Sequence, residues 1–319
     1  MSAVRPRLRP RLRPRLRARA AAAGGGGGYL FDRPSALGGG GPVQVVRLPA
    51  SLGPPLGGAH GLVLDASGNI HSVYFPAAAA AAGEQPLSDS YWDVLGAAAA
   101  LGRSPDDENG HGAAEPRRVG LAGLAAGTCA FAARRAMGGR PLRVRGWELD
   151  GTVVEAARVA MGLGELERDG SLEVTVGDAL VDPPPAEAGG LDVLLVDVFA
   201  DGALLPELRR PGPWRALLAR LDAAGLLVAN LSGGEDRHQA AAFEALQAAR
   251  QERGWGLWVK ELGRVRDCVS ANRLAVAAAD EPSWERWRAD LSAAGFDAPG
   301  RALTAAVVAS DWRDWSRAK

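Results

Sequence analysis

The segment 118–136, RVGLAGLAAGTCAFAARRA, joins a short apolar run to an alanine-rich stretch through small residues at alternating positions. Those residues are Gly123, Ala125 and Gly127, and Thr128 follows them. Small side chains let a backbone approach a ligand closely, and the start of the next helix offers N–H groups to a carboxylate or a phosphate. Any tight turn from a strand into a helix also favours glycine, so the loop alone leaves a purely structural role open.

Acidic residues follow three later apolar runs. Glu148 ends the run LRVRGWE about 20 residues beyond Gly127, a spacing that suits one strand–helix–strand unit. A carboxylate there can accept hydrogen bonds from both ribose hydroxyls of a nucleoside. Asp178 ends VTVGD and can accept from an adenine amino group, while Asp197 ends LDVLLVD and is expected to face the same crevice. Each acid could instead cap a helix or lie in solvent, as we expect for Asp150 at the start of the next helix.

A regular alternation of strands and helices from Arg117 onward must position these side chains. We expect strands at 118–124, 142–149, 171–177, 191–199 and 225–232, and helices at 127–138, 152–161, 213–223 and 235–252. This alternation predicts a parallel sheet with helices on both faces. No helix separates 255–262 from 268–279, which predicts a terminal antiparallel hairpin. The expected fold class is α/β, Rossmann-like, with a seven-stranded, mostly parallel sheet.

Two smaller regions precede this domain of residues 117–319. In 42–116, the segments 61–65 and 69–75 flank a turn sequence and predict a small β-hairpin, followed by a helix at 86–102 that Ser88 or Asp89 would cap. In 1–41, every charged residue before Asp32 is an arginine and prolines recur at regular intervals. This composition predicts a disordered leader and is typical of a transit peptide, for a plastid rather than a mitochondrion. The alternative is a solvated tail on a cytoplasmic protein.

Composition excludes several classes of function. The chain has two cysteines and four histidines without ligand spacing, so we expect no metal site and no disulfide framework. Positive and negative side chains balance at 37 each, and without the leader acids outnumber bases, which argues against nucleic acid as a partner. No apolar run is long enough to predict a membrane span. The terminal hairpin at 255–279 is a candidate surface for a homodimer.

Residues 117–279 resemble the class I S-adenosylmethionine-dependent transferases, and within them the spermidine-synthase-like branch. The stretches that carry the resemblance are RVGLAGLAAGT, WELDGTVVEAAR, LEVTVGDAL, LDVLLVDVFADGALLPEL and LLARLDAAGLLVANL. Their order and spacing match as well. Upstream, GLVLDASGNIHSVYF and LSDSYWDVL resemble a reduced form of that family's N-terminal β-region and the helix after it. The resemblance implies the Rossmann-like fold and either S-adenosylmethionine or its decarboxylated form as cofactor.

The resemblance also implies roles for single residues. The cofactor would be held at its amino-acid end, its ribose and its adenine by, in chain order, Gly123, Ala125, Gly127, Thr128, Glu148, Leu149, Asp178 and Ala179. Asp197 matches the acid that polyamine synthases place beside the attacking amine, which makes it the candidate catalytic residue. Tyr91, Asp93 and Asp201 match residues that hold the substrate.

Departures from the polyamine synthase pattern affect the substrate side. Ala126 stands where those enzymes carry an acid in the glycine loop, and Trp92 stands where they carry Gln or His. Asp201 falls one position later than the family's second acid. A diamine is a dication that needs several carboxylates, so these changes favour methyl transfer over aminopropyl transfer. The acceptor, a small molecule or a protein, stays open, and so does a non-catalytic binding or assembly protein on the same fold.

Overall fold

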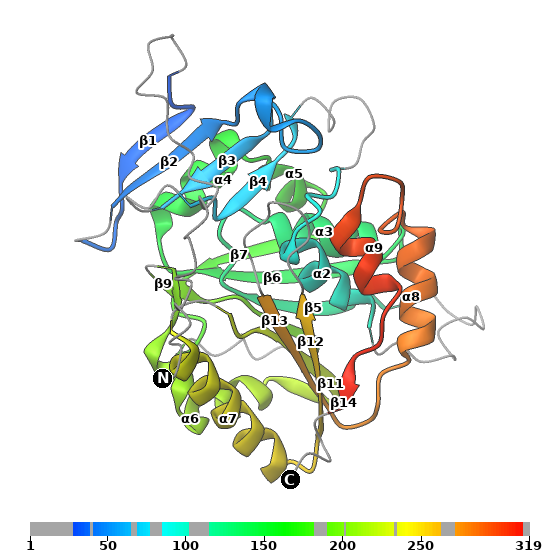
Figure 1. The fold of residues 1–319 in the computed structure, drawn as a ribbon. Coiled ribbons are helices and arrows are strands. Elements are labelled where there is room, and N and C mark those ends of the chain that lie inside the picture. Colours follow the sequence, from blue (N-terminus) through cyan, green and yellow to red (C-terminus); the bar gives the residue numbers. More distant parts are fainter. Residues whose placement is uncertain are drawn as a thin grey trace, which may run out of the picture.

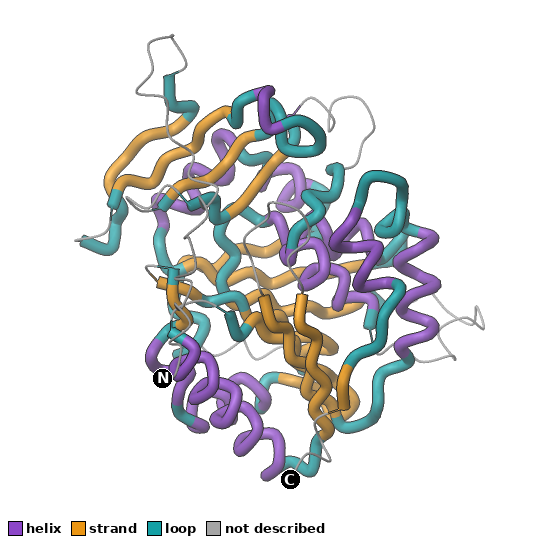
Figure 2. The backbone as a smooth tube through the Cα atoms, in the orientation of Figure 1, coloured by secondary structure: helices purple, strands orange, loops and turns teal. Residues whose placement is uncertain are grey.

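The computed structural model describes residues 28–38, 41–64, 69–76, 85–101, 115–181, 190–200, 202–232, 235–262 and 272–314 (Figures 1 and 2). Its centre is an eight-stranded sheet in the order β14-β12-β13-β11-β8-β5-β6-β7. The strands, in chain order, are β5 (Arg117–Ala122), β6 (Leu142–Glu148), β7 (Leu172–Val176), β8 (Leu191–Val196), β11 (Leu221–Asn230), β12 (Gly256–Leu262), β13 (Asn272–Ala278) and β14 (Arg313–Asp314).

The sheet is parallel on one side and antiparallel on the other. Strands β7, β6, β5, β8 and β11 pair in parallel, and β13 and β12 form the expected antiparallel hairpin. The predicted α/β Rossmann-like class is therefore confirmed. The strand count differs from seven because the two-residue β14 pairs with β12 at the edge. The chain order reverses on the two sides of β5, and such a switch point opens a crevice at the carboxyl ends of the strands.

Helices cover both faces of this sheet. Alternate residues of β8 point to opposite faces, so Val193 and Leu195 join one buried cluster while Leu194 and Val196 join the other. In Figure 1, helices α6 and α7 lie on one side of the sheet, and α2, α3, α8 and α9 lie on the other. The helices are α2 (Tyr91–Ala97), α3 (Thr128–Ala136), α4 (Gly151–Ala160), α5 (Leu163–Arg168), α6 (Pro211–Leu218), α7 (Asp236–Glu252), α8 (Trp284–Ala293) and α9 (Ala302–Val308).

The N-terminal region forms a second, antiparallel sheet. Its order is β1-β2-β3-β4, from β1 (Phe31–Pro34), β2 (Pro42–Arg47), β3 (His60–Val63) and β4 (Ser72–Tyr74). The predicted hairpin is confirmed as the pair of β3 and β4. Strand β1, however, lies inside the segment assigned to the leader, which corrects that boundary. Phe31 is buried and pairs with Val45 of β2, so this strand belongs to the core. Residues 1–27 lie outside the described part of the chain.

Asp150 joins the N-terminal sheet to the central domain. As predicted, it caps α4, accepting a hydrogen bond of 2.8 Å from the Thr152 N–H. It also accepts from the Ser35 hydroxyl at 2.5 Å and from the Ala36 N–H at 3.2 Å, both from the turn after β1. Partial burial raises the pKa of this carboxyl, but the hydrogen bonds outweigh it and the pKa lies below its ordinary value. The ionised carboxylate therefore stabilises the contact between the two sheets.

Ser35→Ala is expected to lower the free energy of unfolding at pH 7 by about 1 kcal/mol, because it removes one charge-assisted, half-exposed hydrogen bond. Since the pKa of Asp150 is depressed in the folded state, this contribution is present above the unfolded pKa and is lost as the pH falls below about 4. Urea unfolding at pH 7 and pH 3 measures both effects. The matched control is Ser51→Ala, at an exposed serine. It is expected to lower the free energy of unfolding by no more than a few tenths of a kcal/mol. Equal losses for the two variants would contradict the assigned contact.

Candidate functional site

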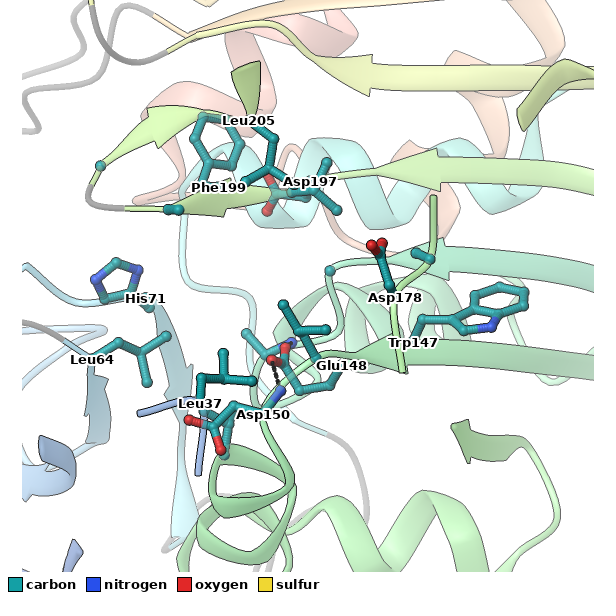
Figure 3. Close-up of a pocket in the computed structure, with 18 of the residues that line it drawn as sticks. Leu37, Leu64, His71, Trp147, Glu148, Asp150, Asp178, Asp197, Phe199 and Leu205 are labelled. Atoms are coloured by element: carbon teal, nitrogen blue, oxygen red, sulfur yellow. Dashed lines mark hydrogen bonds between the residues drawn. The ribbon is translucent and has the colours of Figure 1, made fainter. Parts of the chain in front are cut away.

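A cavity of about 590 Å³ lies at the carboxyl ends of the parallel strands, at the switch point beside β5 (Figure 3). This volume falls in the range of small-molecule and cofactor sites. The loops after β5, β6, β7, β8 and β11 line it, and the turn after β1 lines its opposite side. The polar lining residues used below are Tyr91, Glu148, Asp150, Asp178, Asp197, Asn230, Ser232 and Asn272.

Glu148, at the end of β6, is held in place by backbone groups. One carboxylate oxygen accepts from the Ala125 N–H at 2.9 Å, and the other accepts from the Asp150 N–H at 3.0 Å. Burial raises the pKa of Glu148, and these hydrogen bonds limit the rise. A carboxylate oxygen has two lone pairs, so each oxygen can accept one further hydrogen bond from a ligand. The predicted ribose-binding acid therefore lies in the cavity with acceptor capacity on both oxygens.

The glycine loop contributes small residues to the cavity surface rather than hydrogen-bond donors. All backbone N–H groups of residues 123–127 donate within the chain: to the Trp147 carbonyl twice, to Glu148, to the Ser72 hydroxyl and to the Leu124 carbonyl. These five N–H groups are therefore occupied within the chain and are not open to a ligand. Gly123 and Ala125 line the cavity as predicted. Ala125 keeps the small contact surface although its φ of 47° is one that side chains rarely adopt.

Gly127 and Thr128 have structural roles, which corrects their assignment to the cofactor site. A Cβ on Gly127 would lie 2.7 Å from the Leu163 side chain. Gly127 is also the N-cap of α3, with a left-handed φ of 88°. The Thr128 hydroxyl donates to the Val73 carbonyl at 3.0 Å and accepts from the Val73 N–H at 2.9 Å. Thr128 thus joins α3 to β4 of the N-terminal sheet, and neither residue is among those that line the cavity.

The residues assigned to the adenine end lie where β6 and β7 finish. Leu149, Asp178 and Ala179 all line the cavity. Figure 3 shows the Asp178 carboxylate pointing into the space between Glu148 and Asp197. One oxygen of Asp178 accepts from the Leu180 N–H at 2.8 Å, which fixes the side chain. The other oxygen has no hydrogen bond within the described structure, so it can accept one from a ligand.

Asp197 follows β8 and lies between the side chains of Asn230 and Tyr91. Its two oxygens accept from the Asn230 amide at 3.0 Å and from the Tyr91 hydroxyl at 3.2 Å. Burial raises the pKa of Asp197 to about 6, and the two hydrogen bonds limit this rise. Burial also raises the pKa of Tyr91 well above its ordinary value, so its hydroxyl keeps its proton and donates. The carboxyl is therefore placed to exchange a proton near neutral pH.

The other two substrate candidates have different outcomes. Asp93 is buried in the capping box of α2, where it accepts from the Ser88 hydroxyl at 3.0 Å and the Asp89 N–H at 2.6 Å. Its oxygens are occupied there and it does not line the cavity, which corrects its assignment to the substrate. Ser90, rather than Ser88 or Asp89, is the cap itself, because its hydroxyl accepts from the Trp92 N–H. Asp201 lies outside the described residues.

Sequence reasoning missed the amide groups of the site. Asn230 ends β11, and Asn272 begins the antiparallel β13, so the two come together only in the sheet. Asn230 occupies the same strand-end position as Glu148 and Asp197, and the sequence VAN after an apolar run was a signal for it. Asn272 had no such signal in the sequence. An antiparallel strand brings its first residue, rather than its last, to the edge where the parallel strands end.

The charge of the cavity selects its ligands. Four carboxyl groups line it, and among its described lining residues there is no Lys or Arg. Such a site attracts cations and hydroxyl or amino donors and disfavours phosphates. No group of His, Cys, Asp or Glu side chains in the described ranges is arranged to hold a metal ion. The helices of the described ranges include none with the length and apolar character to cross a bilayer.

The fold is similar to that of solved spermidine synthases. A spermidine synthase in complex with the transition-state analogue AdoDATO matches over 79% of this chain and 72% of its own, with 13% identity and a TM-score of 0.53. A spermidine synthase from Thermotoga maritima matches over 79% and 73%, with 14% identity and the same TM-score. A probable spermidine synthase from Corynebacterium glutamicum matches over 86% and 94%, with 15% identity and a TM-score of 0.50. No protein-family model matches the sequence, and no curated protein sequence matches it significantly.

Proposed function

We propose that the protein is an S-adenosylmethionine-dependent transferase and that it transfers the methyl group. The observation that carries this proposal is the set of carboxylates at consecutive strand ends, Glu148, Asp178 and Asp197, in a cavity with no Lys or Arg among its described lining residues. A nucleoside sulfonium has ribose hydroxyls, an adenine amino group and a positive charge, and it has no phosphate. Each of these features finds an acceptor or an opposite charge in this cavity. The shared fold of the spermidine synthases supports the same ligand class.

The residues present fit such a ligand in order along the sheet edge. Glu148 accepts from the ribose hydroxyls with the lone pairs that its backbone partners leave open. Asp178, one strand further, accepts from the adenine amino group, with Ala179 and Leu149 as the adjoining surface. Gly123 and Ala125 allow close approach on the side of Asp197. The donor supplies a sulfonium whose sulfur keeps the bonding electron pair when the methyl group leaves.

Asp197 then acts on the acceptor. Its carboxylate accepts the proton that an O–H or N–H nucleophile loses as its lone pair forms the bond to the methyl carbon. Asn230 and Tyr91 hold both oxygens of this carboxylate and therefore set its orientation. The rest of the contribution is the positioning of donor and acceptor, because displacement at the sulfonium needs no further catalytic group.

Aminopropyl transfer is the second candidate, favoured by the contact between Tyr91 and Asp197 in a fold shared with spermidine synthases. Against it, Ala126 is buried where an acid would hold the aminopropyl ammonium, and Asp93 is occupied in a helix cap. Among the described residues, Asp197 is then the single carboxylate near the reacting end that could hold an amine. A diamine would therefore be bound weakly, and methyl transfer is the better fit.

Calorimetric titration of the full chain with S-adenosylmethionine and with its decarboxylated form tests this proposal. We expect binding of the first and at least tenfold weaker binding of the second, about 1.4 kcal/mol. Preference for the decarboxylated form would replace methyl transfer by aminopropyl transfer. A folded protein that binds neither form would overturn both activities and leave a non-catalytic scaffold.

The pH dependence of binding is a separate prediction. Because the pKa of Asp197 is about 6, its carboxyl becomes negative as the pH rises through 6 and then attracts the sulfonium. Affinity for S-adenosylmethionine relative to the uncharged thioether S-adenosylhomocysteine is expected to rise about tenfold from pH 5 to pH 7.5. The ratio cancels effects on folding, including those of the buried Asp93, whose pKa is also about 6. In Asp197→Asn the ratio should be constant, and a ratio that still rises would assign the effect to another group.

A further inference from the structure

Asn272 is a polar residue of the cavity that the proposed chemistry does not use. It begins β13, lines the cavity, and is 6% exposed. Its amide nitrogen is buried and has no hydrogen-bond partner in the described structure. A buried amide N–H without a partner costs about 1–3 kcal/mol, so such groups are rare and call for an explanation.

The neighbours of Asn272 are occupied with one another. The Asn230 amide donates to Asp197, and the Asn230 carbonyl oxygen accepts from the Ser232 N–H at 3.2 Å. The Ser232 hydroxyl accepts from the Arg273 N–H at 2.5 Å. Among the side-chain N and O atoms of Asn230, Ser232 and Asn272, only the amide nitrogen of Asn272 is buried without a hydrogen-bond partner in the described structure. Because Asn230, Ser232 and Asn272 line the same cavity as Asp197, the missing partner is on the ligand side.

We propose that Asn272 contacts the acceptor molecule, and that its Nδ2 donates a hydrogen bond to a carbonyl or hydroxyl oxygen of an uncharged acceptor. The inference rests on the proposed transfer function and names the substrate class of that site. The acceptor's O–H or N–H nucleophile then lies at Asp197, and its oxygen lies at Asn272. The unpaired donor is satisfied only when the acceptor is bound.

The charge and polarity of the surroundings restrict the acceptor further. An ammonium group has only donors and cannot pair with the amide N–H of Asn272. A carboxylate at the acceptor end of the cavity, where Asn272 and Asp197 both line it, would be repelled by the Asp197 carboxylate. Leu64, Val198, Phe199 and Leu205 line the same cavity and suit an apolar body. The site therefore selects an uncharged, apolar-bodied molecule that carries an oxygen beside its nucleophile.

Two probes with the same ring and hydroxyl test this selection. Salicylamide carries a neutral carbonyl oxygen beside its hydroxyl, and 2-hydroxybenzylamine carries an ammonium group instead. We expect calorimetry on the full chain, with and without S-adenosylhomocysteine, to give at least tenfold tighter binding of salicylamide. Asn272→Leu should reduce salicylamide binding about tenfold. Asn272→Asp, which removes the donor and adds a charge, should reduce it further and improve binding of the amine.

Stability of the free protein separates a ligand-binding role from a structural one. Asn272→Leu removes an unpaired buried donor, so its melting temperature is expected to equal or exceed that of the wild type, with affinity for S-adenosylmethionine changed less than twofold. A lower melting temperature with unchanged salicylamide binding would overturn the proposal, and so would equal binding of the two probes by the wild type. Wild-type protein that binds salicylamide but no S-adenosyl ligand would overturn the transfer function, and with it the role of Asn272 toward an acceptor, and would leave only the hydrogen bond from Asn272 to a ligand oxygen.

Discussion

Glu148→Ala is expected to weaken binding of S-adenosylmethionine by about 100-fold, equivalent to about 3 kcal/mol. In the proposed function the part-buried carboxylate accepts two charge-assisted hydrogen bonds from ribose hydroxyls, which contribute about 1.5–3 kcal/mol each. The same change leaves the N–H groups of Ala125 and Asp150 without their present partner, so the loop that lines the cavity loses its support as well. Calorimetric titration measures the affinity, and thermal unfolding measures the cost to stability.

Two further variants locate this effect in the site. Glu148→Gln keeps the shape and one acceptor oxygen, and should lose about tenfold in affinity. Glu173→Gln is the matched control, since Glu173 lies on the neighbouring strand β7 but is exposed and pairs with Arg145 at 3.0 Å. Its affinity should stay within twofold of the wild type. A similar loss of affinity in Glu173→Gln, or no loss in Glu148→Ala, would contradict the proposal that Glu148 binds the nucleoside.

Gly123→Ala is expected to destabilise the protein by about 4 kcal/mol or to prevent folding. A Cβ at this position would lie 2.2 Å from the backbone oxygen of Asp197, closer than non-bonded atoms approach. The backbone φ of 85° adds strain for any residue other than glycine. Relief of the clash requires β5 and β8 to separate at their carboxyl ends, where both contribute to the cavity. Chemical unfolding and soluble yield measure the effect.

Gly139→Ala is the matched control for Gly123→Ala. Gly139 has a φ of 82°, and a Cβ there would have nothing within 4 Å. Its expected cost is about 1–2 kcal/mol, from backbone strain alone. The difference between the two variants therefore measures the steric clash with the strand end at Asp197. Equal costs would mean that the sheet edge moves readily, and that Gly123 is not needed for close packing there.

The predicted and observed roles of the glycine loop differ for a physical reason. A bare loop before a helix reads as a ligand-binding turn, because both ligand approach and strand packing require the absence of a side chain. At Gly123 the structure shows a close approach to the protein's own backbone as well as a wall of the cavity. At Gly127 it shows packing against Leu163. Composition cannot separate these causes, since the atom that excludes the side chain comes from a distant segment.

Thr128, the other misassigned residue of this segment, shares this property. It is bonded to Val73, more than fifty residues away along the chain. Asp93, by contrast, is occupied by local groups, and the SDSYWD motif with a serine before an acid three residues later already allowed a capping box. A motif for a cap therefore has to be considered before a carboxylate is assigned to a substrate.

The sequence by itself determined the α/β class, the terminal hairpin and the position of Glu148, Asp178 and Asp197 in one cavity. It could do so because strand and helix periodicities are local, and parallel strands carry their carboxyl ends to the same edge. Only the tertiary structure decided which of these groups keep free acceptor or donor capacity. It also brought β1 into the N-terminal sheet and placed Asn272 in the same cavity as Asn230. Hydrogen-bond capacity is shared among distant segments, so it is known only when the chain has folded.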